Sequence, residues 1–124
     1  MSSKQAVLGI GGVFFKARDP VALAAWYREH LGVPAPENGT FAPFVEQGGT
    51  TVWATFPLDT QYFAPSAAPF MFNYRVSDLD AMLAQLRAAG VPVDDKIDES
   101  EFGRFGWAID PEGNRIELWQ PPAA

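Results

Sequence analysis

The chain contains no cysteine and a single histidine among its 124 residues. The absence of cysteine excludes disulfide bonds, cysteine-ligated metal centres and thiol redox chemistry. Long apolar runs are also missing, since no stretch approaches the roughly 18–20 residues that a membrane-spanning helix needs. Residues 1–5 are polar and lack the apolar core of a signal peptide. We therefore expect a cytoplasmic protein that does not associate with membranes.

Positive charge is scarce, with 9 Lys and Arg against 15 Asp and Glu and a net charge of −6. Such a chain repels nucleic acid unless it carries a basic patch, and the sequence contains none. Acidic side chains gather between residues 94 and 101, where Lys96 is the only base. This run is typical of a solvated loop or an edge strand. The alternative is an acidic rim that attracts cationic ligands.

Motifs for nucleophilic and phosphate chemistry are missing as well. Gly9, Gly11 and Gly12 are not followed directly by a helix or by the Lys-Ser/Thr pair of a phosphate loop. They are expected to allow close backbone approach or to leave room for a ligand. No serine lies in a nucleophile elbow. His30 is expected at the end of a helix, facing solvent and the helix C-terminus, since no partner for a catalytic base is evident.

What the sequence does contain is an internal repeat. Residues 15–19 resemble residues 74–78 at an offset of 59, and each segment is followed by an apolar helical pattern ending in Gly-Val-Pro. At a constant offset of 64, three residues recur, namely Phe41, Gly49 and Pro57 as Phe105, Gly113 and Pro121. Repeats of this kind dictate architecture. The pattern predicts one domain, 1–124, with repeat one at about 6–57, a linker at about 58–69 and repeat two at about 70–121.

The sequence of repeat one predicts a strand, then a helix, then further strands. Asp19 is a good N-cap with Pro20 in the first helical position, and Gly32 is a stop signal. Between them, apolar residues recur at helical spacing. Strands are predicted where β-branched and aromatic residues gather, at 7–17, 41–46 and 51–56.

Repeat two follows the same order. Ser77 and Asp80 form a candidate capping box for a helix that ends at Gly90. The Asx- and Gly-rich turn 110–114 separates two predicted strands, at 105–109 and 115–120. In the proline-rich linker, a short strand is predicted at 61–63.

The segment Asp110-Pro111-Glu112-Gly113-Asn114-Arg115-Ile116-Glu117-Leu118 resembles the closing motif of the glyoxalase/bleomycin-resistance/extradiol-dioxygenase superfamily, also called vicinal oxygen chelate proteins. Residues 15–20, Trp26-Tyr27 and Leu31-Gly32 are also similar to that family, and the resemblance covers about 8–121. It implies an α+β fold in which two tandem βαβββ units form a half-open cup or barrel with the helices outside.

In many members of that family, four equivalent strand positions hold a divalent metal. The resemblance and the repeat offsets assign these positions to Gly12, Trp53, Met71 and Glu117. Only Glu117 is a competent ligand for a hard or borderline divalent ion. We therefore expect no metal and no cofactor.

Alternation along the strands predicts which side chains face the cup. The predicted ligand-binding residues are Phe14, Lys16, Thr51, Trp53, Met71, Asn73, Arg75, Arg115, Glu117 and Trp119. This set combines aromatic walls with a few orienting polar groups. Glu117 is expected either to form a buried ion pair with Arg75 or Arg115, or to accept from a ligand. Trp53 and Trp119 either line the cup or fill the core.

Aromatic residues outside this set are expected in the core or at subunit contacts, and they include Trp26, Tyr27 and Trp107. A half-open cup exposes sheet edges and aromatic side chains, so we expect a homodimer. The pattern leaves open whether the cup forms within one chain or by strand exchange between two.

The leading hypothesis is a metal-free protein that binds a small cationic or aromatic molecule in the mode of the bleomycin-resistance branch. Three of the four family metal positions cannot coordinate a metal, which favours a binding protein over an enzyme and leaves catalysis open. The first alternative is a lyase, isomerase or dioxygenase that recruits a metal through Glu117 and an acid such as Glu46 or Asp110. The second is a degenerate domain with a structural or partner-binding role.

Overall fold

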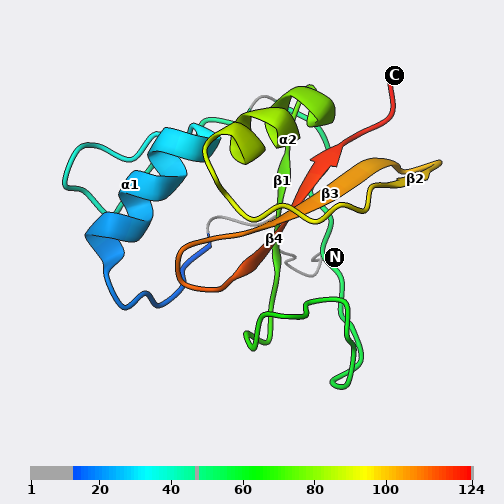
Figure 1. Cartoon of the computed structure of the whole chain (residues 1–124), viewed down its shortest axis with the longest axis horizontal. Coiled ribbons are helices and arrows are strands. Elements are labelled where there is room, and N and C mark those ends of the chain that lie inside the picture. The colour runs from blue at the N-terminus through cyan, green and yellow to red at the C-terminus, as the bar shows by residue number, and fades with distance from the viewer. Residues whose placement is uncertain (1–12, 47, 124) are drawn as a thin grey trace, which may run out of the picture.

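A four-stranded mixed sheet drawn from the second half of the chain is the framework of the computed structural model, which describes residues 13–46 and 48–123 (Figure 1). Within these ranges, the elements are α1 Pro20–Leu31, β1 Phe72–Arg75, α2 Leu79–Ala88, β2 Asp98–Ser100, β3 Gly103–Ile109 and β4 Arg115–Gln120. The sheet order is β1-β4-β3-β2, with β1 parallel to β4 and the other pairs antiparallel. This open sheet confirms the α+β class and the half-open cup.

The helix ends follow local signals. Asp19 caps α1 by accepting a hydrogen bond from the backbone N–H of Ala22 at 3.0 Å, and Gly32 ends the helix in the left-handed conformation at φ 72°. The predicted capping box of α2 is wrong, because Asp78 rather than Ser77 is the N-cap and accepts from the N–H of Ala81 at 3.0 Å. A carboxylate at this position also complements the positive end of the helix dipole.

Neither helix in the described part of the chain has the length and apolar character that crossing a bilayer requires.

The core lies between α2 and one face of the sheet. Leu79, Leu83 and Leu86 of α2 are fully buried against Ile116 and Leu118 of β4. Their spacing of three to four residues places them on one side of the helix. A side chain at position 106 of β3 would press on Leu83, so the glycine there allows α2 to approach the sheet closely.

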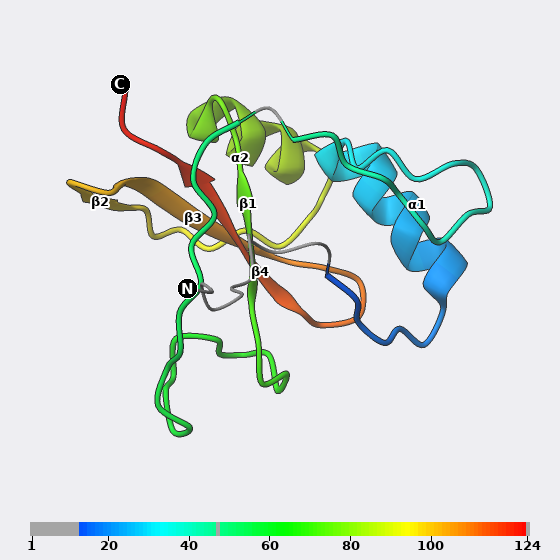
Figure 2. The ribbon, with the colours of Figure 1, turned by 180° about the vertical axis from the view of Figure 1, so that it is seen from behind.

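Both helices of the described residues cover one face of the sheet, and neither covers the other face. Helices α1 and α2 lie on the same side of the sheet, and the loop 57–70 hangs on the opposite side (Figures 1 and 2). Side-chain alternation in β4 gives each face its own set of residues, with Ile116 and Leu118 toward the helices and Glu117 away from them. The face away from the helices is therefore where functional side chains can gather.

The strands predicted for repeat one are not formed in the residues described. Residues 13–17, 41–46 and 51–56 have no strand assignment, and residues 7–12 lie outside the described ranges. A strand is stabilised by the hydrogen bonds of a neighbour, and in the described structure these segments belong to no ladder of the sheet. The alternation of apolar and polar residues in these segments was therefore not sufficient to predict strands.

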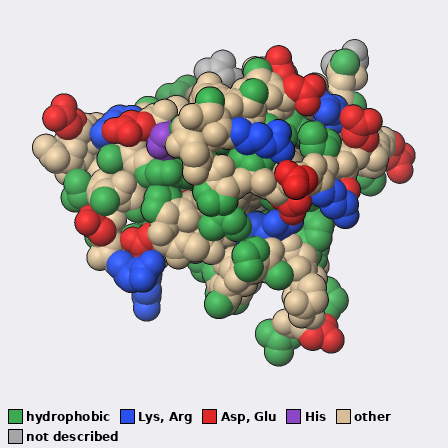
Figure 3. Space-filling model, viewed as in Figure 1, with side chains coloured by type: hydrophobic (Ala, Val, Ile, Leu, Met, Phe, Trp, Pro, Cys, Tyr) green, Lys and Arg blue, Asp and Glu red, His purple; other side chains and the backbone are tan. Residues whose placement is uncertain are grey.

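The predicted strand at 61–63 is also wrong, because the linker forms turns instead. The backbone N–H of Ala64 donates to the carbonyl of Gln61 at 3.1 Å, and Ser66 donates to Phe63 at 3.0 Å. Three prolines in and beside the linker lack an N–H for a ladder. Hydrophobic side chains gather on this loop in the space-filling view (Figure 3). Leu58 of the loop is fully exposed.

Candidate functional site

The candidate site lies on the sheet face without helices, around Glu117 in the middle of β4. Asn73 of β1 is the register partner of Glu117 on one side, and Trp107 of β3 is its partner on the other. Residues directly opposite in a sheet project to the same face. The register therefore places an amide, a carboxylate and an indole in one row across three strands.

Glu117 is held by three neutral donors and is only 8% exposed. Its Oε1 accepts from Nδ2 of Asn73 at 2.7 Å, and its Oε2 accepts from Nε1 of Trp107 at 3.0 Å and from the hydroxyl of Tyr62 at 2.5 Å. A buried carboxylate requires such hydrogen bonds, since an unpaired one is costly.

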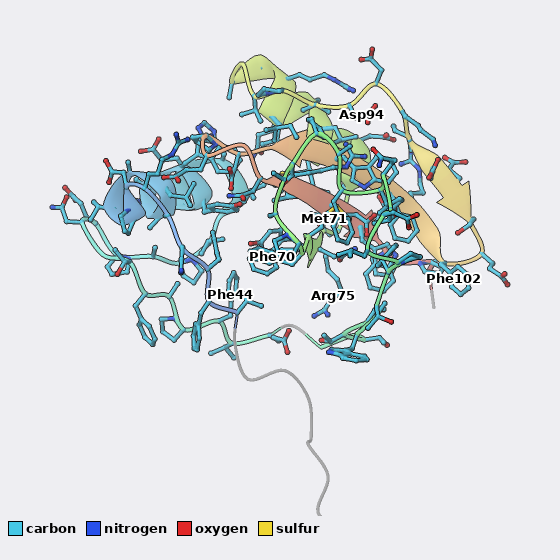
Figure 4. All side chains as sticks on the ribbon, turned by 90° about the horizontal axis from the view of Figure 1, so that it is seen from below. Phe44, Phe70, Met71, Arg75, Asp94 and Phe102 are labelled. Atoms are coloured by element: carbon cyan, nitrogen blue, oxygen red, sulfur yellow. The ribbon has the colours of Figure 1, made fainter. Side chains whose placement is uncertain are left out.

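Of the two alternatives expected for Glu117, the ion pair with an arginine is not formed, because Arg75 and Arg115 bind elsewhere. Arg75 donates to the backbone carbonyls of Gly48 at 2.6 Å and Thr50 at 3.0 Å. Arg75 is aligned with Trp119, two residues beyond Glu117 on β4, and its side chain lies between the sheet and the segment that carries Phe44 (Figure 4). It therefore fastens residues 48–50 to β1.

Arg115 packs its guanidinium over the ring of Trp107, with the central carbon 5.0 Å from the ring centroid. One of its terminal nitrogens is 3.4 Å from Oδ2 of Asp94. The pKa of Asp94 is lowered, first by the backbone N–H of Lys96 and then by Arg115. Arg115 thus contacts the indole whose N–H binds Glu117, rather than Glu117 itself.

The acidic run 94–101 includes the edge strand of the sheet, as one of its two readings predicted. β2, at Asp98–Ser100, is the last strand in the sheet order, and Glu99 pairs with Arg104 of β3 at 2.8 Å. Charged side chains on an edge strand discourage pairing with other chains.

Tyr62 is a site residue that sequence reasoning missed. Its ring stacks on Phe56 with centroids 5.4 Å apart and meets Trp107 edge-on at 6.0 Å. Burial, followed by the hydrogen bond to Glu117, raises the pKa of Tyr62, so the hydroxyl stays protonated and donates at neutral pH. Tyr62 lies in the linker, which has no counterpart in the repeat and no periodicity, so no sequence signal pointed to it.

Trp107 was also missed as a site residue, because it was expected in the core or at a subunit contact. It is 1% exposed and donates to Glu117 through its indole N–H. The sequence could have indicated this role, because pairing the two predicted strands across the turn 110–114 places position 107 opposite position 117.

An aromatic surface extends the same face toward the end of β4. The ring of Trp119 is parallel to that of Phe105, with a centroid separation of 6.0 Å and an interplanar angle of 3°. The indole N–H of Trp119 donates to the carbonyl of Phe102 at 2.8 Å, which fixes the ring orientation. Phe102 lies at the far end of this surface (Figure 4).

The structure does not bring all ten predicted ligand-binding residues together. Asn73, Glu117 and Trp119 lie on the uncovered face, while Arg75 and Arg115 flank it through the contacts above. Met71 is half-buried beside Phe70 at the start of β1 (Figure 4). The members from repeat one lie exposed on segments outside the sheet, namely Phe14, Lys16, Thr51 and Trp53.

The residues of this site do not fit a divalent metal. Of the four family positions, Gly12 lies outside the described residues and Trp53 is 76% exposed. The neighbours of Glu117 offer it N–H and O–H groups, and an indole N–H is a donor only. Within residues 13–46 and 48–123, no group of three or more His, Cys, Asp or Glu side chains comes close enough to hold an ion.

Asp110, one of the acids considered for a metal site, has a structural role. It is 3% exposed and accepts from the hydroxyl of Tyr27 at 2.7 Å and from Nδ2 of Asn114 at 2.8 Å. The backbone N–H groups of Glu112 and Asn114 also donate to it, at 2.9 and 3.0 Å. The conspicuous turn motif thus closes the β3–β4 hairpin and joins it to α1.

Glu112 in the same turn reaches the start of α1. Its carboxylate accepts from the backbone N–H groups of Arg18 at 2.7 Å and Asp19 at 2.9 Å. These hydrogen bonds lower the pKa of Glu112.

Comparisons with solved structures agree with this fold. The chain is similar to the oxidase ChaP-H2, at 22% identity over 87% of this chain and 89% of that chain, with a TM-score of 0.55. It is similar to protein ATC0852 from Agrobacterium tumefaciens, at 25% identity over 84% and 89% of the two chains, with a TM-score of 0.50. The similarity to ChaP-H2 concerns the fold alone.

A shorter part of the chain is similar to TnmS3, an antibiotic binding protein from Streptomyces sp. CB03234, at 39% identity and a TM-score of 0.39. The match covers 41% of this chain and 41% of TnmS3, which is less than half of either protein. No curated protein matches the chain. The glyoxalase-like domain family matches residues 12–119. The chain therefore belongs to the glyoxalase-like domain family, as its closing motif predicted.

Proposed function

We propose that this protein binds a small organic molecule, without a metal, on the sheet face that carries Glu117. The observation behind the proposal is a buried carboxylate held by three neutral donors next to an aromatic surface. Binding sites for small molecules combine apolar walls with a few polar groups that fix orientation. Glu117 supplies the polar group, and Trp107 and Trp119 supply the walls.

The chemistry of this face favours a ligand that is aromatic and offers a hydrogen-bond donor. A carboxylate accepts from N–H and O–H groups, and most strongly from cationic ones. Flat indole and phenyl surfaces attract aromatic rings and cations. The net charge of −6 also favours a cationic over an anionic molecule.

The donor set around Glu117 supports metal-free binding. A metal ion at this carboxylate would need further oxygen or nitrogen lone pairs. The indole of Trp107 and the amide nitrogen of Asn73 point donors at the carboxylate instead. Asp110 is committed to the turn 110–114, and Glu46 lies 3.9 Å from Arg75.

A thermal-shift screen of aromatic amines and phenols tests this function, with hits titrated by calorimetry into wild type, Glu117→Gln and Glu101→Gln. Glu101 is an exposed acid outside the site, so its variant controls for the lost charge. We expect hits to bind Glu101→Gln as they bind wild type, and to bind Glu117→Gln at least about tenfold more weakly, about 1.4 kcal/mol. Equal binding to both variants contradicts the proposal.

Elemental analysis tests the metal-free part. About one divalent ion per purified chain, lost in Glu117→Ala, would favour a metal-dependent lyase, isomerase or dioxygenase instead. We expect no stoichiometric ion in either protein.

We also propose that two copies of the chain form a homodimer. Large apolar side chains of repeat one are exposed, with Phe14 at 92% and Trp53 at 76%, and exposed apolar surface of this kind is typical of protein interfaces. Among the described strands, β1 is the end strand of the sheet opposite the charged edge strand β2, and an edge strand can pair with a second chain. Light scattering at micromolar concentration should give twice the monomer mass of 13.6 kDa, and a value near 13.6 kDa contradicts the dimer.

A further inference from the structure

The position of Tyr62 gives the proposed binding site a more specific chemistry. The side chain of Tyr62 contacts Glu117, Trp107 and Phe56, and it comes from the loop rather than from the sheet. Its hydroxyl makes a 2.5 Å hydrogen bond with the carboxylate that the proposed function assigns to the ligand. A phenol of the protein itself therefore lies where an aromatic donor would bind.

The loop is attached to this site mainly through that one side chain. The backbone hydrogen bonds described for residues 57–66 run within the loop, from Thr60 to Pro57, from Ala64 to Gln61 and from Ser66 to Phe63. Among the residues the structure describes, the one hydrogen bond between this loop and the sheet joins Tyr62 to Glu117. Breaking the hydrogen bond between Tyr62 and Glu117 would therefore leave the backbone hydrogen bonds of the loop's own turns in place.

We propose that Tyr62 occupies the place of the ligand's ring, and that the protein binds hydroxy-aromatic molecules, phenols, which displace it. This inference rests on the proposed function and names the class of ligand for the same site. A phenol from solution offers Glu117 the same O–H donor, so the exchange leaves no buried carboxylate oxygen without its partner. It also offers Trp107 an aromatic edge contact like the one it replaces.

Tyr62 is suited to act as a displaceable group because it is neither fully buried nor fully exposed. It is 36% exposed, whereas its partner Trp107 is 1% exposed. A ring that belonged to the permanent core would be surrounded on all sides. The contrast assigns Trp107 to the fixed wall of the site and Tyr62 to its removable occupant.

The test uses 4-methylphenol, which is the tyrosine side chain without its backbone. Its dissociation constant is measured by calorimetry on wild type, Tyr62→Ala, Tyr62→Phe and Leu58→Ala, with the indole N–H of Trp107 followed by NMR. Leu58 lies in the same loop and is fully exposed, so its variant controls for changes in the loop. 4-Methylanisole, which has the ring but no O–H donor, is the matched control compound.

We expect 4-methylphenol to bind Tyr62→Ala at least about tenfold more tightly than wild type, and to bind Leu58→Ala as it binds wild type. It should shift the Trp107 indole resonance, and 4-methylanisole should bind Tyr62→Ala at least about tenfold more weakly than 4-methylphenol. Tyr62→Phe keeps the ring but loses the hydrogen bond, so it should also bind 4-methylphenol more tightly than wild type.

Equal affinity of 4-methylphenol for wild type and Tyr62→Ala overturns the proposal, as does equal affinity of Tyr62→Ala for the two compounds. If Tyr62→Ala does not fold, refolding by 4-methylphenol supports the proposal. If 4-methylphenol does not refold Tyr62→Ala and binds Tyr62→Phe with the same affinity as wild type, the proposal is overturned.

The failure of this inference is distinguishable from failure of the proposed function. If screened compounds bind wild type through Glu117 but gain nothing from Tyr62→Ala, the site binds ligands and Tyr62 is a fixed part of it. If no screened compound binds and 4-methylphenol binds no variant, the face around Glu117 is not a binding site.

Discussion

The hairpin formed by β3 and β4 and its repeat counterpart, 64 residues earlier in the chain, share a sequence pattern but differ in structure. Ile116 of β4 is 1% exposed, whereas Val52 at the matching position is 67% exposed. Glu117 is buried under three hydrogen bonds, while its counterpart Trp53 is exposed. Alternation of apolar and polar residues therefore does not by itself produce a strand, because a strand also requires a paired neighbour and a covering layer.

The turns of the two segments show one cause of the difference. Asp110 organises the second turn by accepting from the backbone N–H groups of Glu112 and Asn114. At the matching position of the first turn, Glu46 is exposed and lies 3.9 Å from Arg75. The carbonyls of Gly48 and Thr50 bind Arg75 of β1. The second turn closes on itself, whereas the first is held by a side chain of another element.

The largest effect is expected when the paired positions of the two segments are truncated. Ile116→Ala removes a fully buried side chain from the core under α2 and should lower the free energy of unfolding by about 2–5 kcal/mol. Val52→Ala, at the matching exposed position, should change it by less than about 0.5 kcal/mol. Urea denaturation of the three proteins measures both values. A large loss in Val52→Ala would mean that the first segment is buried in solution, and would remove the contrast.

The turn residues give the next largest effect. Asp110→Ala leaves the buried hydroxyl of Tyr27 and two backbone N–H groups without their acceptor, and should lower the free energy of unfolding by about 3 kcal/mol. Glu46→Ala, its counterpart, removes an exposed charge and should change stability by less than about 0.5 kcal/mol. Urea denaturation gives both differences. Equal losses in the two variants would show that the first turn is as organised as the second.

Truncation of Trp53 should affect association more than folding. Because Trp53 is exposed in the single chain, Trp53→Ala should change the free energy of unfolding of the monomer by less than about 0.5 kcal/mol. If this tryptophan lies in the proposed dimer interface, the same variant should raise the dimer dissociation constant at least about tenfold. Sedimentation across a concentration series measures the association. An unchanged dissociation constant places the interface away from residues 51–56.

The smallest expected effect concerns pH and the second turn alone. The backbone N–H groups of Arg18 and Asp19 lower the pKa of Glu112 below its ordinary value of 4.5, and the matching position of the first turn is Gly48. A lowered carboxyl pKa in the folded state contributes stability above pH 4.5, and that contribution is lost as the pH falls through the folded pKa. Glu112→Gln should therefore melt slightly below wild type at pH 7, and the difference should close toward pH 3.

Thermal unfolding at both pH values checks the Glu112 prediction, with Glu37→Gln as an exposed control of the same charge change. A difference in Tm between wild type and Glu112→Gln that is the same at pH 7 and pH 3 would contradict it.

Features governed by neighbours in sequence were predictable. Asp19, Pro20 and Gly32 set the bounds of α1 through capping and backbone geometry that act within one turn of helix. The cap of α2 was misplaced by one residue because Ser77 and Asp78 are both competent caps, and the choice depends on where the chain leaves β1. The strands on either side of the turn 110–114 were also predictable, since alternation and a strong turn agree there.

The candidate site was predictable in part. The closing motif and alternation placed Glu117 on the face of the candidate site, and Asn73 followed from the repeat. Trp107 could have been found by pairing the strands across the turn. Tyr62 could not have been found in this way, because the sequence of a loop without periodicity does not indicate which of its side chains contacts the sheet.

The sequence by itself determined the class of fold, the ends of α1 and the chemistry available at Glu117, since these depend on local propensity, spacing and residue type. Tertiary structure decided which donors surround that carboxylate, where Arg75 and Arg115 bind and which strands of the pattern form. These outcomes depend on contacts between residues far apart in the chain, such as the 55 positions that separate Tyr62 from Glu117. Packing and hydrogen-bond geometry select among such contacts only once the elements are assembled.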